Sequence, residues 1–116
     1  MNNKSTSTML TILIDLDGVL NTYVGNYDEN FIPPIKNGAF EFLSTLSKKY
    51  KIKIFTSRNI ESASKWVEQN NLSALIDGIT NIKEPCYLFV DDRCINFNGN
   101  YSDLYNEIEN FHVWYK

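Results

Sequence analysis

Short apolar runs alternate along the chain with segments of mixed character. Residues 10–16 are almost continuously apolar, which is typical of a strand covered on both faces. Residues 51–56 alternate lysine with isoleucine before an aromatic residue, which predicts a strand with one covered and one partly solvated face. Another apolar run, residues 86–90, follows Pro85 and leads into two aspartates. We expect strands at these three places and a weaker strand over residues 76–82, which a glycine interrupts.

Helical spacing of apolar residues separates these runs. It predicts helices within residues 37–50, 57–71 and 102–111. The expected caps are Asn37 for the first, Asn59 or Ser57 for the second and Ser102 for the third. Residues 113–115 are apolar again and are expected to close the sheet. Strands that alternate with helices favour right-handed crossovers and a mainly parallel sheet. The predicted fold class is therefore α/β, a three-layer sandwich with helices on both faces of a central sheet.

The length of 116 residues, of which 43% are apolar, is sufficient for one domain with its own core. Residues 1–8 are polar and lack periodicity, so we expect a disordered N-terminal tail there and a single domain over residues 9–116. Residues 18–36 are rich in Gly, Pro, Asn and Asp. This composition predicts a long loop or short hairpin above the sheet.

Charge and cysteine content exclude several classes of protein. The net charge is −3, and no segment collects Lys and Arg into a stripe, so duplex DNA is not an expected partner. No stretch has the length of a membrane span or the form of a signal peptide, which favours a cytoplasmic location. Cys86 and Cys94 lack the partners of a zinc site or a disulfide framework, and we expect two reduced thiols with Cys86 buried. The oligomeric state is left open.

Polar groups follow the ends of the expected strands, where ligands bind in open parallel sheets. Each group contains side chains that suit phosphate or metal chemistry. The groups are Asp15 and Asp17, then Thr56 and Ser57, then Asp91 and Asp92, with Lys83 just before the last of these strands.

Four carboxylates that converge on one spot repel one another and raise one another's pKa values unless a cation offsets them. The grouping therefore predicts a bound divalent metal. Oxygen ligands without His or Cys favour a hard ion. Magnesium (Mg²⁺), which binds few carboxylates and retains waters or substrate phosphate, fits this set best.

The pair Asp15 and Asp17 suits phosphoryl transfer. An ionised aspartate can attack phosphorus to give an acyl phosphate that water later hydrolyses, and Asp15 is the candidate for this role. Asp17 is the candidate general acid and base. The Thr56 hydroxyl, the Lys83 ammonium and Mg²⁺ are expected to stabilise the charge on the transferring phosphoryl group.

These residues carry a resemblance to a known family. The segments Asp15-Leu-Asp-Gly-Val-Leu, Phe55-Thr-Ser-Arg, Lys83 and Val90-Asp-Asp-Arg resemble, in the same order, the four motifs of the haloacid dehalogenase (HAD) superfamily of phosphohydrolases. The resemblance extends from Ile12 to about Asn98.

The resemblance implies a HAD-like, Rossmannoid catalytic domain without a separate cap domain. It implies a Mg²⁺-dependent phosphomonoester phosphatase that works through an aspartyl-phosphate intermediate. It also implies the residue roles: Asp15 as nucleophile, Asp17 as acid and base whose backbone carbonyl binds the metal, Thr56 with Ser57 as the phosphate-binding pair, Lys83 as charge stabiliser, and Asp92, in preference to Asp91, as direct metal ligand.

The expected substrate is a phosphorylated small molecule or a nucleic-acid end, because the site has no cap and the nearby loop carries Tyr23, Tyr27 and Phe31. The alternative is a phosphate-binding or receiver-like module with a degenerate site that does not hydrolyse its ligand.

Several of the singled-out residues also have a purely structural interpretation. Thr56 and Ser57 can cap the helix that follows them. Arg58 and Arg93 are interpreted as ion-pair partners of the clustered acids and not as catalytic residues. His112 is interpreted as structural.

Overall fold

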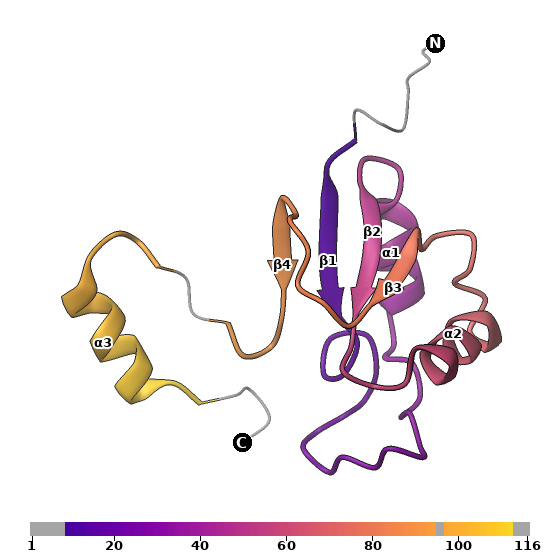
Figure 1. The fold of residues 1–116 in the computed structure, drawn as a ribbon, viewed down its shortest axis with the longest axis horizontal. Coiled ribbons are helices and arrows are strands. Elements are labelled where there is room, and N and C mark those ends of the chain that lie inside the picture. Colours follow the sequence, from indigo (N-terminus) through magenta and orange to yellow (C-terminus); the bar gives the residue numbers. More distant parts are fainter. Residues whose placement is uncertain (1–8, 95–96, 113–116) are drawn as a thin grey trace.

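The computed structural model describes residues 9–94 and 97–112, and it contains one sheet of four parallel strands in the order β3-β2-β1-β4 (Figure 1). The fold is thus α/β with a parallel sheet, as the sequence predicts. In chain order the elements are β1 (Thr11–Asp15), α1 (Ala39–Leu46), β2 (Lys51–Phe55), α2 (Ile60–Gln69), β3 (Gly78–Thr80), β4 (Leu88–Val90) and α3 (Tyr101–Asn110).

Strand β1 lies in the middle of the fold and pairs with both β2 and β4. Its three central residues, Ile12 to Ile14, are all buried, which confirms the interpretation of this run as a strand covered on both faces. Strand β2 buries Ile52 and Ile54 and leaves the lysines between them partly exposed. The alternation of its sequence therefore corresponds to one covered and one partly solvated face.

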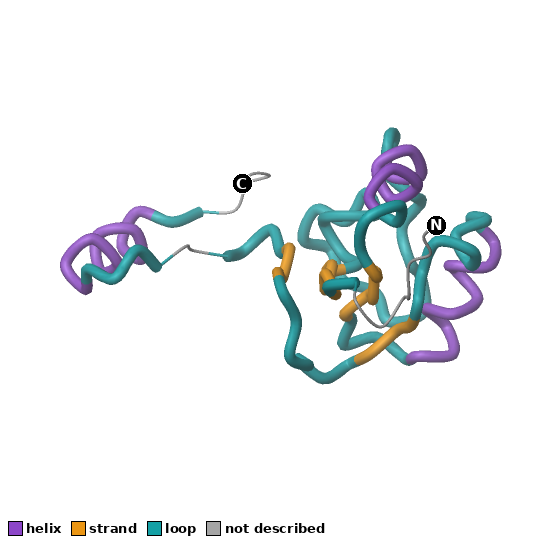
Figure 2. Tube along the Cα trace, turned by 90° about the horizontal axis from the view of Figure 1, so that it is seen from above, coloured by secondary structure: helices purple, strands orange, loops and turns teal. Residues whose placement is uncertain are grey.

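Helices α1 and α2 pack on the same face of the sheet. Ile12 pairs with Ile52 and Ile14 with Ile54, so these four side chains share one face, and they belong to one buried cluster with residues of both helices. Figure 2 shows the two helices on one side of the strands. The physical reason is the direction of winding: β1-α1-β2 and β2-α2-β3 step the same way across the sheet, and right-handed crossovers then place both helices on the same side.

No helix covers the opposite face within the described residues. This face carries Leu13, Phe55 and Phe89, with the rings of Phe55 and Phe89 in edge contact at 5.5 Å. The connection from β3 to β4 passes here, because Glu84 pairs with Lys53 of this face at 2.9 Å.

Helix α3 buries none of its residues and lies apart from the sheet in both views (Figures 1 and 2). The expectation of helices on both faces is therefore met on one face only. The radius of gyration is 15.7 Å, against about 13 Å for a compact chain of this length, which reflects this separation.

Several boundaries differ from the sequence predictions. Helix α1 begins after Gly38, whose φ is 88°, and no side chain caps it, so the prediction of Asn37 as cap is wrong. Asn59 caps α2 as expected by accepting from the Ser62 N–H. Helix α3 is capped by Asn100 and begins at Tyr101, so the prediction of Ser102 as its cap is wrong.

Cys86 is exposed, which corrects the expectation that it is buried; the short strand β4 begins only after it, at Leu88. Two expectations, the tail over residues 1–8 and the closing strand over residues 113–115, lie outside the described residues. Within the described ranges, no helix has the length and apolar character needed to cross a bilayer.

Candidate functional site

Three carboxylates meet at the carboxyl edge of the sheet, where β1 and β4 end side by side. Ile14 pairs with Val90 in the parallel register, so Asp15 at the end of β1 lies next to the two aspartates that follow β4. Asp15, Asp91 and Asp92 each place one carboxylate oxygen within 4.8 Å of the others. We call these three residues the acid cluster.

Burial and mutual repulsion disfavour the charged forms of the acid cluster. The pKa of Asp15 is raised to about 7, first by burial and then by the charges of Asp91, Asp17 and Asp92. The pKa of Asp92 is raised by burial and by a hydrogen bond and repulsion from Asp91, which outweigh the positive charge of Arg93. Oxygen Oδ2 of Asp92 is buried without a hydrogen-bond partner. The cluster therefore contains a carboxylate oxygen without a hydrogen-bond partner, and the repulsion between its negative charges is not compensated by the protein.

Gly18 allows the acid cluster to form. Its φ is +90°, a conformation that favours glycine, and a Cβ at this position would collide with the Asp92 carboxylate. The chain turns sharply here after β1 and lets the loop after β4 approach the backbone. The absence of a side chain at Gly18 is thus required on two independent grounds.

Asp17 does not join the acid cluster through its side chain. Arg58 Nε donates to both of its carboxylate oxygens, at 2.9 Å and 3.1 Å, and Asn21 Nδ2 donates to Oδ1 at 3.0 Å. This corrects the expectation of four converging carboxylates: the cluster holds three, and the fourth pairs with a buried guanidinium. The pairing confirms Arg58 as an ion-pair partner of the acids. A metal contact through the Asp17 backbone carbonyl stays a prediction.

Thr56 and Ser57, the expected phosphate-binding pair, differ in exposure. Thr56 is 2% exposed, and its hydroxyl accepts from the backbone N–H of Arg58 at 3.0 Å. The hydroxyl hydrogen of Thr56 is still able to donate to a phosphate oxygen. Ser57 is exposed. Asn59, not this pair, supplies the side-chain cap of α2.

Lys83 lies against Phe89, on the face of the sheet that carries Leu13, Phe55 and Phe89. Its ammonium nitrogen is 4.8 Å from the centroid of the Phe89 ring, a cation–π geometry. Its positive charge lowers the pKa of the Cys94 thiol, although burial and the charges of Asp91, Asp15 and Asp92 raise that pKa on balance. The effects that raise the pKa of Asp15 come from burial and from carboxylates, so a direct effect of Lys83 on Asp15 stays a prediction.

Sequence reasoning missed Asn21, which is fully buried in the loop after β1. Its Oδ1 accepts from the backbone N–H groups of Gly18 and Tyr23, at 3.1 Å and 3.0 Å, while its Nδ2 donates to Asp17. One amide side chain therefore fixes both the turn and the Asp17 carboxylate. An asparagine three residues after a glycine in a turn is a weak signal, because such residues commonly bond to nearby backbone.

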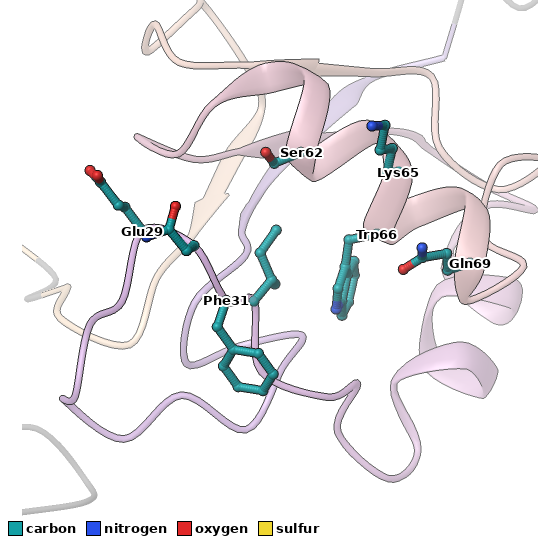
Figure 3. A pocket seen from close by; sticks show the side chains of 8 residues that line it. Glu29, Phe31, Ser62, Lys65, Trp66 and Gln69 are labelled. Atoms are coloured by element: carbon teal, nitrogen blue, oxygen red, sulfur yellow. The ribbon is translucent and has the colours of Figure 1, made fainter.

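Two adjoining pockets, of about 400 Å³ and about 380 Å³, lie between the 18–36 loop and helix α2. Figure 3 shows Trp66 extending from α2 toward the loop that carries Phe31, across the larger pocket. Ser57 lines the smaller one. The residues that line both are Glu29, Asn30 and Ser62.

Comparisons of the chain with family models, with curated proteins and with solved structures found no match. A functional interpretation therefore depends on the residues themselves and on how the fold arranges them. The acid cluster and the Asp17–Arg58 pair are the two features from which such an interpretation starts.

Proposed function

We propose that the protein is a Mg²⁺-dependent phosphohydrolase of the HAD type, without a cap domain, that cleaves phosphomonoesters through an aspartyl-phosphate on Asp15. The observation that carries the proposal is the acid cluster at the ends of β1 and β4, with a buried Asp92 oxygen that has no partner. Three ionised carboxylates held this close raise the free energy of the folded state unless a cation lies between them. Their position after the central strand matches the place where open parallel sheets bind ligands.

The residues of the acid cluster fit a magnesium ion. Asp15, Asp91 and Asp92 supply carboxylate oxygens from two adjacent strand ends, and Mg²⁺ typically uses one or two carboxylates with waters and substrate phosphate. The unpartnered Asp92 oxygen supports Asp92 as a direct ligand. When bound, the ion supplies positive charge that favours ionised Asp15 and neutralises phosphoryl oxygens.

In the first half of the reaction, a carboxylate oxygen of Asp15 attacks the phosphorus and the bond to the ester oxygen breaks. Asp17 enters this step as a protonated carboxyl group, whose carbonyl oxygen still accepts from Arg58, and it gives its proton to the departing alkoxide. In the second half, Asp17 accepts a proton from a water molecule, whose oxygen attacks the phosphorus and releases inorganic phosphate and free Asp15. The Thr56 hydroxyl and the Lys83 ammonium stabilise the phosphoryl oxygens in this scheme.

The organic part of the ester occupies the pockets beside Ser57 in this proposal. The smaller pocket begins at Ser57 and Tyr27, and the larger one continues to Phe31 and Trp66. Exposed aromatic rings such as those of Tyr27 and Phe31 suit stacking on a planar group. Nucleotides and nucleic-acid ends are therefore the first substrates to test.

The test is a phosphatase screen with sugar phosphates, nucleoside monophosphates, phosphopeptides and oligonucleotide ends, with and without Mg²⁺. We expect hydrolysis that stops on chelation and falls at least about 10³-fold in Asp15→Asn, with the circular dichroism spectrum retained. Acid-quenched wild type should carry one phosphoryl group on the peptide that contains Asp15. Asp103→Asn, in the first turn of α3, is the matched control and should keep full activity.

Full metal-dependent activity in Asp15→Asn would show that the nucleophile is assigned wrongly. A phosphorylated Asp15 that persists without turnover would favour the receiver-like alternative. No hydrolysis of any ester class, with Mg²⁺ still bound, would favour a phosphate-binding module.

A further inference from the structure

Arg58 is a charged side chain inside the protein, with 3% of its surface exposed. Removing a guanidinium from water costs several kcal/mol unless its donors are paired. Here one of its nitrogens, Nη2, is buried without a hydrogen-bond partner. An arginine held in this way is a poor source of stability, and buried groups left unsatisfied in native proteins call for another explanation.

The remaining contacts of Arg58 join three segments that are distant in sequence. Its Nε donates to the Asp17 carboxylate, and its Nη1 donates to the Asp28 carbonyl at 2.9 Å. Its guanidinium carbon lies 4.6 Å from the centroid of the Tyr27 ring. Its own backbone N–H donates to Thr56 Oγ1. One side chain thus connects the turn after β1, the 18–36 loop and the turn after β2.

We propose that Arg58 is a positioning residue for the reaction: it fixes the orientation of the Asp17 carboxylate, and it fastens the 18–36 loop at Tyr27 and Asp28. This inference rests on the proposed function, in which Asp17 acts as acid and base. Two donors, Arg58 Nε and Asn21 Nδ2, leave the carboxylate little rotational freedom. A proton donor held in one orientation is effective only while that orientation is kept.

A lysine cannot replace Arg58 in this arrangement. The fork of the guanidinium reaches Asp17 through one nitrogen and the Asp28 carbonyl through another, while its central carbon lies over the Tyr27 ring. An ammonium is a point charge without that shape. Arg58→Lys therefore keeps the charge and loses the simultaneous contacts.

The first experiment measures kcat and KM of Arg58→Ala, Arg58→Lys and the control Lys53→Gln, which removes a surface ion pair of the same 2.9 Å length. We expect kcat to fall about 10²-fold in both Arg58 variants, and KM to rise as well because the released loop lines the proposed substrate pockets. Methylguanidine added to Arg58→Ala should restore part of kcat. A raised KM with kcat intact, or no recovery with methylguanidine in a folded variant, would overturn the positioning role.

The second experiment measures amide hydrogen exchange over residues 22–33 and needs no enzymatic activity. Tyr27→Leu keeps the Asp17–Arg58 pair and removes the stacked ring, so it serves even if the Arg58 variants do not fold. We expect faster exchange of the loop in Tyr27→Leu and in folded Arg58→Lys, and no change in Lys53→Gln. Unchanged exchange in Tyr27→Leu would overturn the fastening of the loop. A wild type inactive on every ester would refute the proposed function, and the exchange rates would still decide whether Arg58 holds the loop.

Discussion

Asp15 and Asp17 are two residues apart and have opposite surroundings. Asp15 ends β1 and faces other carboxylates, and its pKa is raised to about 7. Asp17 lies past the strand end, where a guanidinium and an amide donate to its oxygens. The difference arises because β1 stops at Asp15 and the chain then turns at Gly18 with positive φ, so the second carboxylate lies on Arg58 and Asn21.

In the proposed reaction the two aspartates have different roles: Asp15 is the nucleophile, and Asp17 is the acid and base. The acid cluster has carboxylate oxygens to offer to a metal ion, whereas the Asp17 carboxylate already accepts hydrogen bonds from Arg58 and Asn21. A nucleophile benefits from a metal close by, and an acid and base benefits from a fixed orientation. The following predictions, from the largest expected effect to the smallest, test whether the two carboxylates differ as described.

Removing the Asp17 charge should destabilise the protein most. In Asp17→Asn the Arg58 guanidinium, whose side chain is 2% exposed, is left inside the fold without its anionic partner. We expect a loss of about 3 kcal/mol in the free energy of unfolding, measured by urea denaturation. Lys53→Gln, which breaks a half-exposed pair, is the control and should change little. An equal effect of the two substitutions would show that the Asp17–Arg58 pair is an ordinary surface contact.

The acid cluster should make stability depend on pH in the presence of a chelator. The pKa of Asp15 is raised from 3.8 to about 7, so the folded state holds its proton more tightly than the unfolded state. The stabilisation from this proton is complete below about pH 4 and is lost as the pH rises toward 7. We expect a loss of about 2 kcal/mol between pH 5 and pH 7.5.

In Asp15→Asn this loss should be smaller, because the asparagine does not titrate and the raised pKa of Asp92 still contributes. The measurement is urea denaturation at several pH values with EDTA present. A wild type whose stability stays level over this range would contradict the raised pKa of Asp15.

Mg²⁺ should offset part of the loss of stability at higher pH by binding to the folded state alone. At an ion concentration ten times the dissociation constant, the expected gain is about 1.4 kcal/mol, seen as a higher melting temperature in Mg²⁺ than in EDTA. Asp92→Asn should lose this gain. An unchanged gain in Asp92→Asn would place the binding site elsewhere.

Gly18→Ala should have a smaller effect of two parts. Positive φ costs a non-glycine residue about 1 kcal/mol, and this cost is shared by the control Gly38→Ala, since Gly38 has nearly the same φ of 88° and no atoms near its missing Cβ. Only the Gly18 substitution displaces the Asp92 carboxylate. We therefore expect similar losses of stability but weaker Mg²⁺ binding in Gly18→Ala alone, by titration calorimetry. Equal binding in the two variants would argue against a role of Gly18 at the cluster.

Local pattern was sufficient to predict β1 and the meeting of Asp15 with Asp91 and Asp92. A continuous apolar run identifies a central strand, and the carboxyl ends of neighbouring parallel strands lie at one edge. Local pattern could not predict which side chain holds the Asp17 carboxylate, because its partner Arg58 is 41 residues away in the sequence. The burial of Thr56 likewise depends on β3, whose Thr80 carbonyl accepts from the Thr56 N–H at 3.0 Å.

Helix α3 was predicted from the sequence, but its lack of packing against the sheet was not. Helical spacing predicted α3, but periodicity says only that one side of a helix is apolar and not that another element covers it. Leu104 is partly buried, whereas Ile108 remains 54% exposed. The same spacing in α2 accompanies buried Ala63, Trp66 and Val67, so packing partners decide what the pattern leaves open.

The central claim is that Asp15, Asp91 and Asp92 hold one hard cation beside the nucleophile. Its most direct test is the crystal structure of the protein grown with Mn²⁺, which replaces Mg²⁺ and scatters anomalously. The claim predicts one strong anomalous peak in contact with carboxylate oxygens of Asp15 and Asp92, and with the Asp17 side chain still on Arg58. A peak at another site, or no peak with the Asp15 and Asp92 carboxylates pointing apart, would contradict it.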